Sequence, residues 1–335
     1  MSATIHDVAR EAGVSIKTVS RVINGERNVA PATVQLVVEA IAALDYHPNQ
    51  FARSLRSGAS DTIGVVVDSL SDPFFATIIS VAERRAMAEG MDILVASTGA
   101  DATRAASQIT RLVRRRVRGL LVTPYGRECA SALPADTAAV LIDRRGGFEM
   151  FDSVTVPNEA SAREAVEHLL AYGHRRVGFL GSSLGFETVE GRVQGYRSAL
   201  AAAGLEVDER LIEAAWGADA AEVAATRLLS IPDPPTAIFA ATPMAGQGAF
   251  AAMRGTHHEA VALLVFGDFP MADLLTPAIS VVDQDPAGQA EVAMDRLFAR
   301  IAGDDGPPIH RVLPTCFIPR GSAEVSPAAP ARSRS

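Results

Sequence analysis

Short, almost wholly apolar segments alternate with longer amphipathic segments from residue 62 to residue 284, and this alternation restricts the fold more than any other feature of the sequence. A strand that is apolar on both faces must be buried on both faces, as in parallel sheets covered by their connecting helices. The strand candidates read TIGVVVD, DILVAST, GLLVTP, AAVLIDR, SVTVP, RVGFLGS, TAIFAAT, ALLVFGD and AISVVDQ. Helix-like runs such as FFATIISVAERRAMAEG and NEASAREAVEHLLAYG lie between them. The sequence therefore predicts an α/β fold with parallel sheets.

The number of strand candidates predicts two lobes. Nine strands are more than one small sheet usually needs, and two Rossmann-like lobes, each with a doubly wound sheet, fit them better. Ligands of such folds bind outside the carboxyl ends of the strands. We therefore expect a ligand site between the two lobes.

Residues 1–46 predict a different, all-helical unit. In TIHDVAREAG, Thr4 is a suitable N-cap, Asp7 lies in the first turn and Gly13 can end the helix. Ser15 can cap the next helix, IKTVSRVIN. Pro31 suits the first position of a third helix, whose apolar residues repeat at helical spacing.

Two short helices joined by a turn that contains glycine are typical of a helix-turn-helix, whose second helix enters the major groove of DNA. On the second helix, Val19 and Val22 would face inward, and Ile16, Lys17 and Ser20 would face outward. Lysine can donate to guanine, and isoleucine can contact a thymine methyl group. Lys17 is the single lysine of the chain. The alternative is a solvated lysine on a small helical hairpin.

The charge is divided unevenly along the chain. Residues 1–60 carry six basic and five acidic side chains, a net charge of +1, and the remaining 275 residues carry −9. An acidic protein is not drawn to nucleic acid as a whole, but a locally neutral or basic segment can still contact phosphates. The basic run RLVRRRVRG at residues 111–119 is interpreted as a solvated helix face with cations near its C-terminal end, in preference to a second DNA site.

Several other signals restrict the function. The two cysteines, Cys129 and Cys316, have no metal-ligand spacing and fit a reducing compartment. No secretory signal and no apolar run long enough for a bilayer is present, so we expect a cytoplasmic protein without membrane contact. His257 and His258 are adjacent and lack the spacing of a zinc motif. We expect no metal, no cofactor and no enzymatic activity.

Longer stretches of the sequence resemble a known protein family. TIHDVAREAGVSIKTVSRVINGERNVAPATVQLVVEAIAALDYHPNQFARSLRSG is similar to the N-terminal module of the LacI/GalR (lactose-repressor) family of transcription regulators. Further similarity follows in TIGVVVDSLSDPFFATII, NEASAREAVEHLLAYGHRRVGFLG, GRVQGYRSALAAAGL and VLPTCFIPRGS. The resemblance implies a helix-turn-helix domain followed by a two-lobed, periplasmic-binding-protein-like sensor domain. The expected domains are residues 1–46, a hinge at 47–60, a sensor at 61–322 and a disordered tail at 323–335.

The resemblance also implies DNA-contacting residues. Ile16 and Lys17 match the variable recognition positions, and Leu55 matches a leucine that wedges into the minor groove and kinks the duplex. Ala52 would let two hinge helices approach, and Arg53 could track phosphates. The remaining matches to positions that contact DNA are Thr4, Ser15, Thr18, Ser20, Arg21, Asn24 and Asn28. The implied assembly is a homodimer on a pseudo-palindromic operator, with a tetramer left open.

In the sensor, the resemblance implies a small effector between the lobes. Phe74 would stack on it, Asp143 and Arg192 would grip it, and Phe239 would form an apolar wall. The chain departs from the family at two places. Thr242 and Pro243 replace an Asn-Asp pair, and Gly267 precedes Asp268 where the family has two acidic or amide residues. Both departures remove groups that hold sugar hydroxyls, so a sugar acid or another metabolite is also considered.

Some alternatives stay open at this stage. Arg144 and Arg145 indicate either an anionic ligand or an exposed loop pair, and Trp216 either lines the cleft or packs. A two-lobed body of this kind also occurs in solute-binding proteins that feed transporters, although the helix-turn-helix opposes that function. A sugar-modifying enzyme is the third class, and no catalytic constellation supports it.

Overall fold

The computed structural model describes residues 3–23, 29–46, 60–126, 128–182, 185–254 and 260–327. The chain divides into two compact units, Met1–Asp61 and Thr62–Ser335. We call the first unit the head and the second the body. The predicted boundaries of the hinge stay a prediction, because residues 47–59 lie outside the described part of the chain.

The head contains three helices, α1 (Ile5–Glu11), α2 (Ile16–Ile23) and α3 (Pro31–Ala43). Thr4 caps α1 in a capping box with Asp7, as predicted, and the φ of Gly13 is +65° where the chain leaves the helix. Ser15 accepts a hydrogen bond from the Thr18 N–H at 3.1 Å at the start of α2. A small core holds the three helices together and includes Val8, Ala9, Ala12, Val19, Val37 and Ala40.

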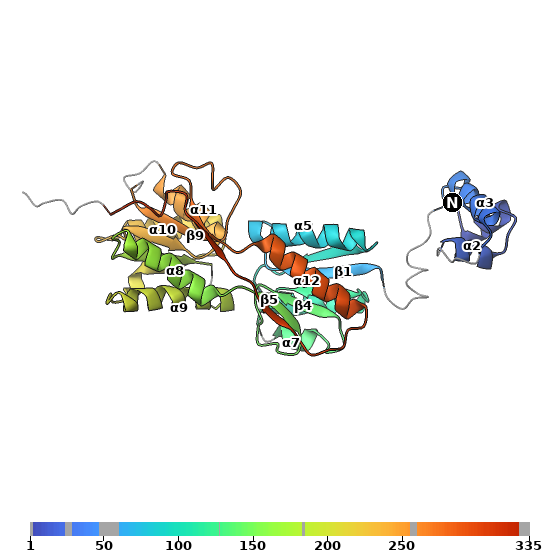
Figure 1. The fold of residues 1–335 in the computed structure, drawn as a ribbon, viewed down its shortest axis with the longest axis horizontal. Coiled ribbons are helices and arrows are strands. Elements are labelled where there is room, and N and C mark those ends of the chain that lie inside the picture. The colour runs from blue at the N-terminus through green and yellow to red at the C-terminus, as the bar shows by residue number, and fades with distance from the viewer. Residues whose placement is uncertain are drawn as a thin grey trace, which may run out of the picture. The chain divides into compact units, whose positions relative to one another are not determined.

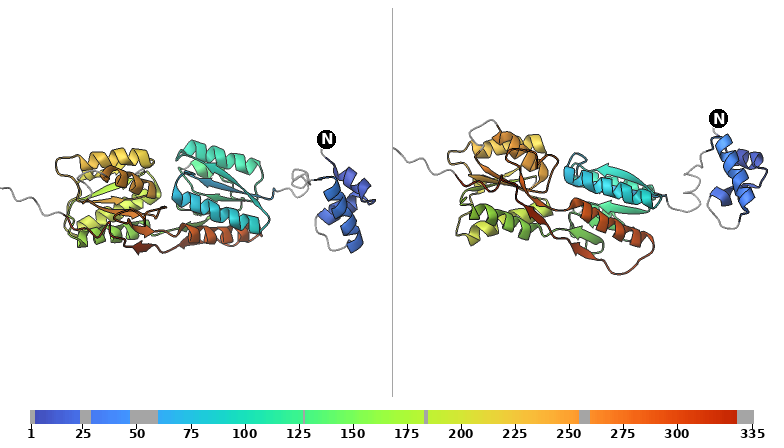
Figure 2. Two further views of the ribbon diagram at one scale, coloured as in Figure 1. Left: turned by 90° about the horizontal axis from the view of Figure 1, so that it is seen from above. Right: turned by 45° about the horizontal axis from the view of Figure 1, so that its top comes forward.

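The body has two lobes, and each is a six-stranded sheet between helices (Figures 1 and 2). The sheet of lobe 1 has the order β11-β5-β4-β3-β1-β2. Its strands are β1 (Thr62–Val67), β2 (Asp92–Ser97), β3 (Gly119–Val122), β4 (Ala139–Ile142), β5 (Asp152–Thr155) and β11 (His310–Val312). Helices α5 (Pro73–Ala88) and α12 (Pro286–Ile301) lie side by side on one face, and α6 (Ala102–Arg114) and α7 (Glu128–Ala132) cover the other.

Lobe 2 repeats the same architecture. Its sheet has the order β12-β10-β9-β8-β6-β7. The strands are β6 (Val177–Gly181), β7 (Ile212–Ala214), β8 (Ala237–Ala240), β9 (Ala262–Phe266), β10 (Ser280–Asp283) and β12 (Cys316–Ile318). Helices α8 (Asn158–Ala171) and α9 (Glu187–Ala202) pack together on one face, and α10 (Ala218–Leu229) and α11 (Pro243–Met253) pack on the other.

Burial on both faces explains the apolar strands. In β1, Ile63, Val65 and Val67 belong to the core beneath α5 and α12, whereas Val66 belongs to the core beneath α6 and α7. Alternate residues of one strand therefore enter opposite cores, and the five residues Ile63–Val67 are all apolar and buried.

The fold class predicted from the sequence is confirmed, with all nine expected strands present. The prediction missed β7, β11 and β12, which are only three residues long each. It also expected purely parallel sheets, whereas β12 pairs with β10 in the antiparallel direction. Three segments cross between the lobes, at residues 156–157, 284–285 and 313–315.

The predicted disordered tail starts too early. Ala323 is fully buried, Glu324 bonds to Ser280 and His168, and the Val325 carbonyl bonds to His174. Residues 323–327 therefore belong to lobe 2, because buried polar groups of that lobe need them as partners. Residues 328–335 lie outside the described part.

Replacement of Gly195 by alanine should destabilise lobe 2. A Cβ there would clash with two backbone atoms of α8. It would lie closer to the Glu159 carbonyl oxygen than van der Waals contact allows, and 2.8 Å from the Arg163 amide nitrogen. Because backbone cannot move aside as a side chain can, we expect Gly195→Ala to lower the free energy of unfolding by about 3 kcal/mol. Urea denaturation measures it. Gln194→Ala, on the exposed side of the same helix, is the control, and equal stability of the two variants would contradict this packing.

Candidate functional site

The exposed start of α2 is the candidate DNA-reading surface of the head. Val19 is fully buried, whereas Ile16 is 37% exposed and Lys17 is exposed. The hydroxyl groups of Ser15 and Thr18 lie 2.8 Å apart in the first turn. The helix therefore presents an apolar and a cationic side chain side by side, next to two hydroxyl groups that can reach phosphate oxygens.

The other predicted DNA contacts divide into two groups. Thr4 is exposed at the N-cap of α1, and Ser20 and Arg21 are half-buried on α2. Asn24, Asn28, Ala52, Arg53 and Leu55 lie outside the described residues.

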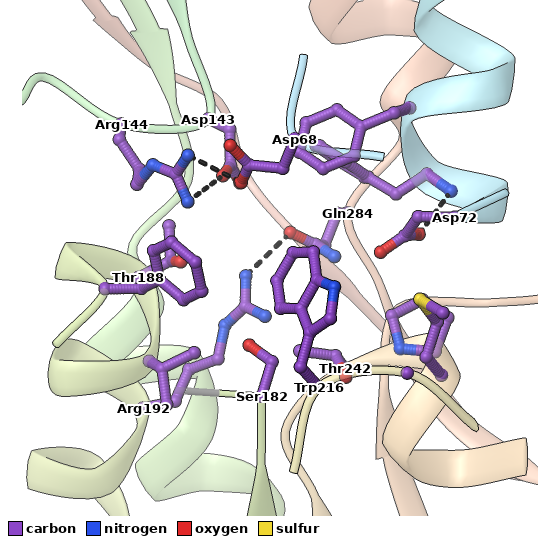
Figure 3. A pocket seen from close by; sticks show the side chains of 17 residues that line it. Asp68, Asp72, Asp143, Arg144, Ser182, Thr188, Arg192, Trp216, Thr242 and Gln284 are labelled. Atoms are coloured by element: carbon purple, nitrogen blue, oxygen red, sulfur yellow. Dashed lines mark hydrogen bonds and ion pairs between the residues drawn. The ribbon is translucent and has the colours of Figure 1, made fainter. Parts of the chain in front are cut away.

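The body contains a pocket between its lobes, at the carboxyl ends of the strands (Figure 3). Lobe 1 contributes residues that follow β1 and β4 and the start of α5. Lobe 2 contributes α9, the start of α11 and the loop after β7. This is the location that the sequence predicted for a ligand site.

A buried group of charges forms one end of the pocket. The Arg144 guanidinium donates to Asp68 at 2.6 Å and lies 3.8 Å from Asp143, and both Arg144 and Asp68 are almost fully buried. Burial raises the pKa of Asp143, although Arg144 and Arg192 oppose the rise. Among the described residues the Asp143 carboxylate accepts no hydrogen bond, and its φ is +73°, a left-handed conformation that costs about 1 kcal/mol. Asp143 thus lies at ion-pair distance from Arg144, and its carboxylate oxygens can still accept hydrogen bonds from a ligand.

Arg192 is the second buried cation. It donates to the Asn158 side chain at 2.8 Å, the Ala241 carbonyl at 2.6 Å and the Gln284 side chain at 3.0 Å. Its guanidinium also lies 3.9 Å from the centre of the Phe266 ring. All three acceptors are neutral, and burial lowers its pKa to about 10, so it stays charged at pH 7. A guanidinium has more N–H groups than these three bonds use, and the rest can donate to a ligand.

Asp72 adds a third carboxylate. It caps α5 by accepting a hydrogen bond from the Phe74 N–H at 3.0 Å. Burial, and then repulsion from Asp143 and Asp68, raises its pKa to about 6. The pocket therefore holds three carboxylates against two guanidinium groups, and the free oxygens of Asp72 and Asp143 favour a ligand that donates several hydrogen bonds.

Aromatic rings complete the lining. Trp216 is 40% exposed and lies 5.6 Å from Phe186, ring centre to ring centre. Phe186 also lies beneath the Arg144 guanidinium at 4.7 Å. In Figure 3 the indole of Trp216 occupies the middle of the pocket. Of the two interpretations of Trp216 considered from the sequence, the structure supports a place in the cleft.

Hydrogen bonds of the Glu187 carboxylate join the two lobes beside the pocket. Glu187, in the first turn of α9 in lobe 2, accepts hydrogen bonds from the backbone N–H groups of Arg145 at 3.2 Å and Gly146 at 2.7 Å in lobe 1. The φ values of Gly146 and Gly147 are +60° and +78°, so this loop can turn its amides toward an anion. Glu187 therefore stabilises the described arrangement of the two lobes.

The structure brings together four of the predicted effector-binding residues, Phe74, Asp143, Arg192 and Thr242. Thr242 caps α11 through a hydrogen bond from the Ala245 N–H.

Phe239 and Asp268 do not line the pocket. Phe239 is fully buried in the core of lobe 2, since its side chain points from the middle of β8 toward α8 and α9. Asp268 is bound by Arg320 at 2.5 Å; burial opposes its ionisation, but Arg320 outweighs this and lowers its pKa.

Sequence reasoning missed Asp68, Asp72, Gln284 and Glu187. Asp68 directly follows β1, and its position at the carboxyl end of a strand was a usable signal. Arg144 was left open between a ligand contact and an exposed loop pair, and it is buried. Arg145 pairs with Glu149 near the surface.

Two further findings concern metal ions and membranes. In the described ranges, no group of three His, Cys, Asp or Glu side chains is placed to hold a metal ion. No helix among the same residues has the length and apolar character to cross a membrane.

Asp72→Asn should stabilise the protein in a pH-dependent manner. The ionised carboxylate is disfavoured in the folded state, whose pKa of about 6 lies above the usual 3.8. Since Asp72 is only partly buried from solvent, we expect a gain of about 1–2 kcal/mol in the free energy of unfolding at pH 7, with the helix cap preserved. The gain should shrink as the pH falls through 6 and vanish near pH 4. Denaturation at several pH values tests it, with Asp101→Asn at the exposed cap of α6 as control. A gain that does not change with pH would refute the burial argument.

Glu187→Ala should open the cleft. Two backbone amides lose their charged acceptor, a loss of about 1 kcal/mol and thus a several-fold shift toward open forms. Trp216 is the single tryptophan of the chain, so its fluorescence reports on the pocket. We expect stronger quenching by acrylamide and red-shifted emission. Glu190→Ala, an exposed residue of the same turn, is the control. Identical quenching in both variants would mean that Glu187 does not hold the lobes together.

Both the head and the body are similar to known protein families. Residues 4–49 match the family described as "Bacterial regulatory proteins, lacI family", and residues 166–323 match the "Periplasmic binding protein-like domain". The chain is 31% identical to the HTH-type transcriptional repressor PurR of Mannheimia succiniciproducens, over 90% of this chain and 93% of the relative. It is 32% identical to the HTH-type transcriptional regulator GalS of Salmonella typhimurium, over 94% of both proteins.

Solved structures agree with these relatives. The lac repressor dimer bound to operator and the anti-inducer ONPF is 25% identical and superposes with a TM-score of 0.84, covering 96% of this chain and 99% of that chain. The complex of the transcriptional regulator CelR with cellobiose is 29% identical, with a TM-score of 0.70 and the same coverage. A helix-turn-helix head, a two-lobed body and relatives matched over nearly their whole length all agree: the chain belongs to the LacI family of bacterial transcription regulators.

Proposed function

We propose that this protein is a repressor that binds a pseudo-palindromic DNA operator as a homodimer, and whose DNA affinity is controlled by a small effector in the interlobe pocket. The observation that carries the proposal is the orientation of α2, which buries Val19 and leaves Ile16 and Lys17 exposed at its N-terminal end. A recognition helix contacts base edges with its N-terminal residues.

Within this proposal the DNA contacts have distinct roles. Ile16 and Lys17 read bases, and Thr4, Ser15, Thr18, Ser20, Arg21, Asn24 and Asn28 contact the backbone or bases. In the hinge, Leu55 enters the minor groove, Ala52 lets two hinge helices meet and Arg53 contacts phosphates. The hinge roles rest on the family resemblance of the sequence PNQFARSL.

A dimer follows from the demands of specificity. One helix-turn-helix reads too few base pairs to compete with the non-specific sites of a genome, and two half-sites related by a dyad multiply the discrimination. The related lac repressor structure is a dimer bound to operator, which supports the same assembly here.

The pocket favours a small polar effector such as a sugar or a sugar acid. Asp72 and Asp143 offer free acceptors, Arg192 offers donors, and Trp216 offers a flat apolar face. The hydroxyl groups at the edge of a sugar ring can exchange hydrogen bonds with these carboxylates and the guanidinium, and a face of the ring can pack on the indole. The related structure of CelR holds cellobiose, which agrees with this class.

The alternative function, a solute-binding protein of a transport system, would use the same two-lobed body. The head argues against it, since a transport protein has no use for an exposed recognition helix. The matched relatives are named as regulators and repressors, which supports a protein that acts on DNA in the cytoplasm and has no enzymatic activity.

In-vitro selection of bound duplexes from random sequences tests the function directly. The proposal expects recovery of one inverted repeat at about 150 mM salt. Metabolites that quench or shift Trp216 fluorescence are then tested for their effect on operator affinity. Protein that recovers no common sequence, with or without these metabolites, would exclude the repressor function.

Lys17→Ala, carried through the same selection, should relax the preference at one symmetric position of each half-site. The loss of a base contact costs about 1–3 kcal/mol on the preferred sequence and little on others. Gln35→Ala, on the exposed surface of α3, is the control and should recover the wild-type sequence. If Lys17→Ala weakens binding equally on every duplex, Lys17 contacts a phosphate.

A further inference from the structure

The last turn of α6 carries a cluster of arginines that the function proposed above does not use. Residues 111–118 contain five arginines and no acidic residue, whereas the rest of the body beyond residue 60 carries 20 basic and 34 acidic side chains. Arg111, Arg114 and Arg115 are all exposed and follow one another at helical spacing on one side of α6. We call these three residues the arginine ridge.

The ridge lacks the carboxylate partners that other arginines of lobe 1 have. On α5, Arg84 and Arg85 pair with Glu291 and Asp295 of α12. On α12, Arg296 and Arg300 pair with Asp152. For the three ridge guanidinium groups, the described residues supply no ion pair and no hydrogen-bond acceptor. Like charges at this spacing repel each other, and the helix dipole at the C-terminal end offsets the repulsion.

The ridge lies at the end of lobe 1 where the chain arrives from the head. The Arg118 N–H donates to the Thr62 carbonyl at 2.8 Å, and Gly119 pairs with Ile63 in the sheet. Thr62 begins the body, so the segment that follows the ridge is bonded to the first residue of the body. The last turn of α6 and the entry point of the linker therefore share one end of the sheet.

This placement limits what the ridge can reach. Residues 44–61 connect α3 to the body and span at most about 60 Å when fully extended. DNA held by the head thus stays within the reach of this linker, which raises its effective concentration for residues at this end of lobe 1. DNA is a suitable partner for this row of arginines, because its phosphates supply the negative charges that the protein does not.

From this placement we propose that the arginine ridge contacts the phosphate backbone of DNA beside the operator and forms a second, sequence-independent DNA contact of the body. The proposal rests on the proposed DNA-binding function. It differs from the helix-dipole interpretation of the same residues, which gives the ridge a role in stability alone.

The test compares the triple variant R111Q/R114Q/R115Q with wild type on two duplexes. The first ends at the selected operator, and the second extends it by about 15 base pairs on each side. On the extended duplex we expect the variant to bind about tenfold more weakly at 100 mM salt, and the slope of log K against log salt to fall by about one to two per subunit. On the short duplex the two proteins should bind alike, and the selected sequence should stay the same.

A matched control separates the ridge from net charge. R163Q/R197Q/R227Q removes three charges from lobe 2, where the exposed Arg163 and Arg227 and the half-buried Arg197 pair with Glu167, Glu213 and Glu209. Equal affinity of the ridge variant and wild type on the extended duplex, or an equal loss in the control, would overturn the proposal. A thermal melt checks folding, and R114Q/R115Q replaces the triple variant if that variant unfolds. Failure of wild type to select any operator would instead refute the proposed function.

Discussion

The hydrogen bonds of Arg192 are the interaction on which the arrangement of the body depends. Its guanidinium is buried between the lobes, where an unpartnered charge would cost several kcal/mol. Two of its acceptors belong to the crossings between the lobes, since Asn158 follows the crossing at residues 156–157 and Gln284 lies in the one at 284–285. A ligand that contacts Arg192 therefore acts on the segments about which the lobes would move.

The charge distribution of the pocket agrees with this role. Arg144 and Asp68 satisfy each other, whereas Asp143 and Asp72 keep acceptors that the protein leaves unused. Glu187 closes the cleft from the other lobe through backbone amides. A ligand that prefers one arrangement of the lobes over another would shift the balance between them in proportion to that preference.

The sequence predicted the fold from particular patterns. Strands such as TIGVVVD are apolar on both faces, and capping residues such as Thr4 and Ser15 mark helix starts, so these elements follow from local chemistry. The site was predicted less completely. The pairing of Asp68 with Arg144 joins positions 76 residues apart and needs the sheet order to be known. Phe239 and Asp268 follow the family pattern in sequence, but strand orientation and Arg320 direct their side chains away from the pocket.

In the proposed function, one pocket and one DNA-reading head are coupled through the body. Coupling of this kind is reciprocal, because a ligand that changes DNA affinity by some factor must have its own affinity changed by DNA by the same factor. The most direct measurement is calorimetric titration of a pocket ligand into free protein and into the operator complex. We expect unequal ligand affinities, whose ratio equals the ratio of operator affinities with and without ligand. A ligand that binds beside Trp216 with the same affinity in both titrations would contradict it.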